Sequence, residues 1–152
     1  MPISARFVHT SVVAKDWQKL SRFYEEVFGC IPVPPERNLS GEWIEKATGV
    51  ADAHILGIHL RLPGHGPEGP TLEIFQYNLE EERPATAVNR PGFAHIAFAV
   101  GDVESALHLV KMAGGCAIGE IVSLPIPGAG TVTIVYATDP EGNIIELQTW
   151  SK

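Results

Sequence analysis

The stretch Phe7-Val8-His9-Thr10 occurs a second time as Phe93-Ala94-His95-Ile96. The match continues without a gap and at a constant offset, and it includes three further pairs: Asp16 and Asp102, Gly29 and Gly115, and Cys30 and Cys116. A chain that repeats its own pattern in this way is expected to form two similar structural modules.

A second repeated stretch lies near the end of each copy. Leu72-Glu73-Ile74 recurs as Ile145-Glu146-Leu147, at a different offset, so each copy contains one early histidine and one late glutamate. Two imidazoles and two carboxylates are a plausible set of ligands for Ni²⁺, Co²⁺, Fe²⁺, Mn²⁺ or Zn²⁺. The absence of cysteine from this set argues against a closed structural zinc site.

The composition is that of a soluble protein large enough to bury a core, with 152 residues of which 45% are hydrophobic. The 11 basic and 18 acidic residues give a net charge of -7, which disfavours nucleic acid and anionic membranes as partners. No stretch approaches the roughly 20 apolar residues of a membrane span, and residues 1–6 lack the layout of a signal peptide. We expect a cytoplasmic protein that acts on a small molecule, with two reduced, buried cysteines.

The first copy is predicted to contain a strand over residues 6–14 and a helix that begins after Asp16 and ends at Gly29. The prolines that follow, at positions 32, 34 and 35, predict an irregular stretch. A short helix over residues 43–50 and strands over residues 53–62 and 71–77 complete the copy.

The second copy repeats this order. We expect a strand over residues 92–100, a helix from Asp102 to about Ala113 and a strand over residues 116–122. A loop over residues 125–130 leads to the last two strands, residues 131–137 and 144–150. The chain is therefore predicted to consist of a module over residues 1–78, a linker over residues 79–91 and a second module over residues 92–152.

Strand alternation places the two glutamates on defined faces. Glu73 shares a face with Phe75 and Tyr77, and Glu146 shares a face with Gln148 and Trp150. The opposite faces are apolar and can pack on the helices. We therefore predict that the glutamates point to the other, concave side and that three aromatic residues bind substrate beside them: Phe75, Tyr77 and Trp150.

These motifs resemble those of the vicinal oxygen chelate superfamily, which includes glyoxalase I, methylmalonyl-CoA epimerase, extradiol dioxygenases, fosfomycin-resistance enzymes and bleomycin-binding proteins. The resemblance rests on the Phe-x-His strands, the aspartate helix starts, Leu72-Glu73-Ile74 and the closing stretch from Asp139 to Leu147. It implies an α+β fold of two paired βαβββ modules that form an open, U-shaped barrel around a divalent metal. It also implies a homodimer and a metal-ligand set of His9, Glu73, His95 and Glu146.

The resemblance favours a glyoxalase-like lyase or isomerase that removes a proton next to a metal-polarised carbonyl. Glu73 and Glu146 are both candidates for the catalytic base. Typical glyoxalases carry an arginine four residues after the first histidine, to hold a glutathione carboxylate. Val13 stands there in this chain, so glutathione and coenzyme A both remain open as carriers.

Three alternatives stay open. A methylmalonyl-CoA-epimerase-like enzyme usually carries glutamine at the position of Glu73. An extradiol dioxygenase commonly uses two histidines and one glutamate. A non-catalytic, bleomycin-resistance-like protein would use the groove only to bind a ligand.

The other four histidines have no repeat partner. His54 and His59 fall on opposite faces of one predicted strand, and both are interpreted as structural, although His59 can also line the cavity. His65, in a Gly-Pro turn, and His108, on the second helix, are expected to be exposed.

Overall fold

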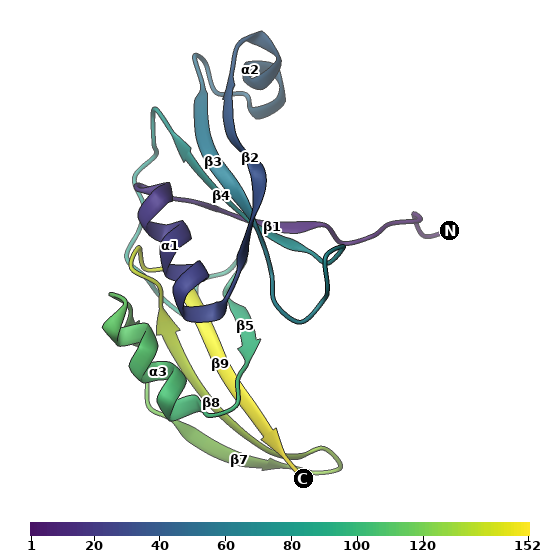
Figure 1. Ribbon diagram of the computed structural model, residues 1–152, viewed down its shortest axis with the longest axis vertical. Coiled ribbons are helices and arrows are strands. Elements are labelled where there is room, and N and C mark those ends of the chain that lie inside the picture. Colours follow the sequence, from purple (N-terminus) through teal and green to yellow (C-terminus); the bar gives the residue numbers. More distant parts are fainter. The chain divides into compact units, whose positions relative to one another are not determined.

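The first half of the chain forms a four-stranded mixed sheet (Figure 1). The computed structural model covers residues 1–152 and divides into two compact units, Met1–Glu82 and Arg83–Lys152. In the first unit, neighbouring strands follow the order β1 (His9–Val13), β4 (Thr71–Tyr77), β3 (His54–Arg61) and β2 (Ile31–Ser40). β1 runs parallel to β4, and the other pairs are antiparallel.

Helix α1 (Trp17–Phe28) covers one face of this sheet. The Asp16 carboxylate accepts a hydrogen bond from the backbone N–H of Lys19, and Gly29 ends the helix in the left-handed conformation, with φ 68°. The helix buries its apolar residues against β3 and β4, which bury Leu60, Leu72 and Ile74 on the same side. The predicted start and end of this helix are confirmed.

Strand β2 corrects the prediction of an irregular stretch after Gly29. Its prolines are tolerated because β2 is an edge strand that pairs only with β3, and because the pairing is interrupted by a bulge between Val33 and Arg37. Helix α2 (Glu42–Thr48) follows, close to the helix predicted over residues 43–50, and is capped by Gly49.

The second unit repeats the architecture. Its strands follow the order β5 (Ile96–Ala99), β9 (Ile144–Ser151), β8 (Gly130–Thr138) and β6 (Cys116–Ala117), and β7 (Val122–Ile126) also pairs with β8. Helix α3 (Val103–Met112) begins after Asp102, whose carboxylate accepts from the N–H of Ser105, and packs on β8 and β9. β5 is again parallel to the last strand, β9.

Three predictions for the second unit were wrong in detail. The strand expected over residues 92–100 is limited to β5, so His95 lies just before it. The strand expected over residues 116–122 is limited to β6, and part of the loop expected over residues 125–130 belongs to β7. Pro125 lies within β7, opposite Thr131, because β7 pairs with β8 alone and its outer side needs no backbone donor. Cys30 is buried, as expected, and burial raises the pKa of its thiol to about 11. The expectation of a second buried cysteine was wrong, because Cys116 is exposed at the start of the short strand β6.

The α+β fold class is confirmed, with open sheets rather than closed barrels. Each unit follows the order strand, helix and further strands, and α2 is an addition in the first unit. None of the helices is long and apolar enough to cross a membrane.

The turn before β9 is organised by Asp139, whose side chain is 1% exposed. Its carboxylate accepts hydrogen bonds from the N–H groups of Glu141 and Asn143 and from the Asn143 side-chain amide. Arg83 donates to the carbonyls of Glu141 and Gly142 on the same turn. This network sets where β9 begins.

We expect Asp139→Ala to lower the free energy of unfolding by about 2–3 kcal/mol, because it leaves buried donors without an acceptor. Asp139→Asn keeps one carbonyl-type oxygen and is expected to lose less. Urea denaturation followed by circular dichroism measures both values. An alanine variant as stable as the wild type would show that the network does not hold the turn.

Candidate metal centre

Two neighbours of β4 bring histidines to Glu73. In the parallel pair, Ser11 of β1 lies opposite Glu73, and His9 lies two residues earlier on the same side of the strand. In the antiparallel pair, His59 of β3 lies directly opposite Glu73. Backbone pairing alone therefore places the three side chains on one face, opposite α1.

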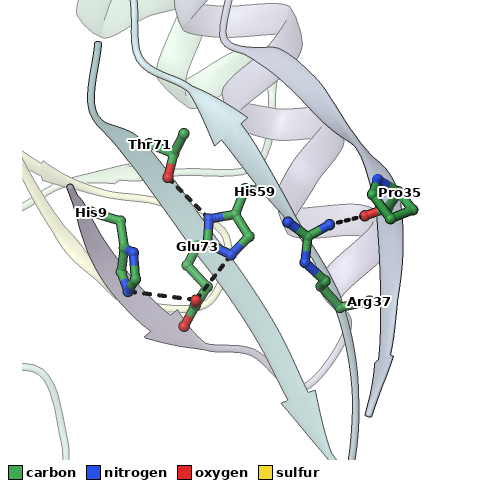
Figure 2. Close-up of polar contacts among 6 residues, drawn as sticks. All are labelled: His9, Pro35, Arg37, His59, Thr71 and Glu73. Carbon is green, nitrogen blue, oxygen red and sulfur yellow. Dashed lines mark hydrogen bonds and ion pairs between the residues drawn. The ribbon is translucent and has the colours of Figure 1, made fainter. Parts of the chain in front are cut away.

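The three side chains are in direct contact (Figure 2). The Oε2 atom of Glu73 lies 3.0 Å from His59 Nε2 and 3.5 Å from His9 Nε2. The two imidazole rings meet edge to face, with centroids 5.3 Å apart. One potential ligand atom from each residue lies within 4.8 Å of the other two, so the cluster can converge on a single metal ion.

The cluster is sheltered but accessible. The side chains of Glu73 and His59 are 13% and 16% exposed, and that of His9 is 38% exposed. His59 Nδ1 lies 3.0 Å from the hydroxyl of the buried Thr71. This contact fixes the imidazole and turns Nε2 toward Glu73, as an outer partner does for a metal-binding histidine.

Burial lowers the pKa of His59 below its ordinary value of 6.5. The negative charge of Glu73 opposes this effect, and the nearby charges of Arg37 and Arg61 add to it. His59 is therefore held in the neutral form, which is the form that binds metal. Two imidazole nitrogens and a carboxylate suit the first-row transition metals or zinc.

The second unit places a related group around Glu146. Ala97 of β5 lies opposite Glu146 and His95 lies two residues earlier, as His9 does in the first unit. Tyr136 of β8 lies opposite Glu146, in the place that His59 holds opposite Glu73. The rings of His95 and Tyr136 are 5.1 Å apart.

Neutral donors hold the Glu146 carboxylate. Gln148 Nε2 donates to Glu146 Oε2 at 2.7 Å, and Trp150 Nε1 donates to Gln148 Oε1 at 2.7 Å. The Tyr136 hydroxyl also hydrogen-bonds Glu146. Burial, followed by the charge and the hydrogen bond of Glu146, raises the pKa of Tyr136.

Of the predicted site residues, His9 and Glu73 meet within the first unit, and His95 and Glu146 lie beside Tyr136 within the second. The full ligand set stays a prediction. His59 belongs to the first cluster, whereas the sequence predicts a structural residue that can also line the cavity. Its position depends on the β3–β4 register, which the repeat does not reveal because the equivalent residue is Tyr136.

The predicted pocket aromatics have different surroundings. Phe75 and Tyr77 pack against a small core around α2, formed by Ile44, Ala53 and Ile55. The Phe75 ring also lies 6.0 Å from that of His59. Trp150 is 48% exposed. Their role in substrate binding stays a prediction.

The sequence model of the Glyoxalase/Bleomycin resistance protein/Dioxygenase superfamily matches residues 6–147. A protein of Vibrio parahaemolyticus named probable lactoylglutathione lyase is 29% identical over 147 residues, which cover 95% of this chain and 90% of the relative. A Vibrio cholerae protein of the same name is 26% identical over 145 residues, covering 93% and 88%. The crystal structure of a glyoxalase family protein from Bacillus cereus matches the fold with a TM-score of 0.83 at 19% identity, covering 99% of this chain and 97% of that one.

The lowered pKa of His59 predicts a pH effect on the metal-free protein. As the pH falls, His59 is protonated at a higher pH in the unfolded chain than in the folded chain. The free energy of unfolding therefore falls as the pH drops below about 6.5. His59→Gln is expected to weaken this dependence. Urea denaturation between pH 5 and pH 7.5, after treatment with a chelator, measures it.

His65→Gln is the control, because His65 is an exposed loop histidine. If the His59 and His65 variants lose the same amount of pH dependence, the burial of His59 is not its cause.

Proposed function

Because this chain belongs to the Glyoxalase/Bleomycin resistance protein/Dioxygenase superfamily, we propose that it is a metal-dependent lyase or isomerase that moves a proton next to a carbonyl group. The observation that carries this proposal is the convergence of His9, His59 and Glu73 on one sheet face, with ligand atoms within 4.8 Å of one another. A cluster of this kind, sheltered yet reachable, has the donor types of a transition-metal site.

His9, His59 and Glu73 would hold the metal in the first unit, and His95 and Glu146 are the two further ligands proposed from the repeat. A bound divalent metal supplies Lewis-acid polarisation of a carbonyl oxygen, which makes the neighbouring C–H more acidic. The Thr71 hydroxyl keeps His59 oriented for this task.

The two glutamates have different surroundings for proton transfer. Glu73 lies between two imidazoles, whereas Glu146 accepts hydrogen bonds from the neutral groups of Gln148 and Tyr136. A carboxylate can take the proton from carbon and return it to the neighbouring position. We propose Glu73 or Glu146 as this base, and the experiments below distinguish them.

The names of the two Vibrio relatives support a lactoylglutathione-lyase type of reaction, in which the substrate is the hemithioacetal of a ketoaldehyde and a thiol. Glu73 also matches this reaction better than the epimerase alternative, which usually has glutamine at this position.

Protein purified without chelator is expected to contain about one divalent metal ion per chain. His9→Ala, His59→Ala and Glu73→Ala should each reduce the metal content severalfold, because each removes a ligand from the cluster. Mass spectrometry of the metals, after extensive dialysis, gives the stoichiometry.

His54→Ala provides the control, because His54 lies on β3 but its imidazole contacts Asn38 instead. Full metal occupancy in the Glu73 variant would show that the proposed metal centre is wrong. The same measurement on His95→Ala and Glu146→Ala tests the ligands proposed for the second unit.

The metal-loaded enzyme should incorporate deuterium next to the carbonyl when it turns over the methylglyoxal–glutathione hemithioacetal in D₂O. At equal metal content, whichever of Glu73→Gln and Glu146→Gln removes the base should lower kcat about 10²–10⁴-fold. Proton NMR follows the exchange, and Glu68→Gln, in an exposed turn, is the control.

Methylmalonyl-CoA under the same conditions tests the epimerase alternative. If the metal-loaded protein exchanges a proton with neither substrate, the proposed reaction is wrong.

A further inference from the structure

Two arginines lie on the same sheet face as the metal cluster without a carboxylate partner. Gly57, His59 and Arg61 alternate along β3, and Arg37 of β2 pairs with Gly57. On this face Glu73 forms ion pairs with His9 and His59, and neither guanidinium takes part in one.

The two arginines have different local roles. Arg61 donates to the carbonyl of Gly69 and so ties together the two ends of the turn between β3 and β4. Arg37 donates to the carbonyl of Pro35, two residues away on its own strand. This single local bond leaves other donors of the Arg37 guanidinium available.

The bulge in β2 determines where Arg37 lies. Val33 pairs with His59 and Arg37 pairs with Gly57, so the β2 residues between them oppose only Ile58. Bulges of this kind change the direction of a side chain and are frequent beside active sites. Figure 2 shows the Arg37 side chain next to the His59 ring, on the side away from His9.

The charges on this face differ from those of the whole chain. The net charge of the chain is -7. The charges that act on His59 are the negative charge of Glu73 and the positive charges of Arg37, His9 and Arg61. A locally positive site in an acidic protein attracts and orients anions.

We propose that Arg37 determines substrate specificity by binding an anionic group, a carboxylate or a phosphate, of the molecule that reacts at the metal centre. This inference rests on the proposed function and deepens it. Arginine suits the task because its planar fork binds a carboxylate or phosphate through two parallel hydrogen bonds.

Equilibrium binding tests the proposal without depending on turnover. Isothermal titration calorimetry on the metal-loaded full chain compares two inert probes, S-methylglutathione for the carboxylate source and S-methyl-coenzyme A for the phosphate source. Arg37→Gln should weaken binding of one of them about tenfold to a hundredfold, and Arg37→Lys should weaken it less. The probe that is affected identifies the anion.

Kinetics give a second readout. With hemithioacetals of methylglyoxal, Arg37→Gln should raise KM for the glutathione adduct if the carboxylate is the anion. Its kcat should stay within about twofold, and its KM for the neutral 2-mercaptoethanol adduct should change far less than its KM for the glutathione adduct. Lys46→Gln is the matched control, because it removes the same charge from an exposed position on α2.

Two outcomes would overturn the proposal. One is a wild-type protein that binds neither probe. The other is an Arg37→Gln variant that keeps its affinity for the anionic probes, or that loses affinity for charged and neutral adducts alike. A failure of the proposed function would instead appear as absent turnover with all substrates, while probe binding still reports on Arg37.

Discussion

The parallel pairing of the first strand of each unit with its last strand is the constraint on which the rest depends. It places Ser11 opposite Glu73 and Ala97 opposite Glu146, and a histidine lies two residues before each of these partners, at the start of β1 and just before β5. Backbone hydrogen bonds fix this register, and a slip of one residue would turn the glutamate to the helix-covered side. The repeat in the sequence therefore preserves a relation between strands that are far apart in the chain.

The same backbone carries different chemistry in the two units. Opposite the glutamate, the first unit has His59 and the second has Tyr136. An imidazole adds a third potential metal ligand to the first cluster, whereas a phenol with a raised pKa remains a neutral hydrogen-bond donor to Glu146. The donors able to bind a metal within one unit are therefore concentrated in the first.

The sequence predicts the parts of this structure that depend on local signals. Asp16 and Gly29 bound α1 because a side-chain cap and a left-handed glycine act within a few residues. β2 and β7 were harder to predict because both contain prolines, which a strand tolerates when it pairs on one side only. Which strands lie at an edge depends on pairing between distant segments of the chain, and local sequence does not show it. His59 was missed for a related reason: its partner Glu73 is set by the long-range register of β3 and β4, and its counterpart in the repeat is not a histidine.

Burial and charge at His59 also connect the metal centre to its surroundings. An imidazole beside a carboxylate usually takes up a proton more readily, because the negative charge favours the cation. Here burial outweighs the effect of Glu73, and the positive charges of Arg37 and Arg61 act in the same direction as burial. Arg37 and Arg61 make this face positive, and their charges also help to keep His59 neutral. The same sheet face can therefore attract an anion and still bind a metal ion.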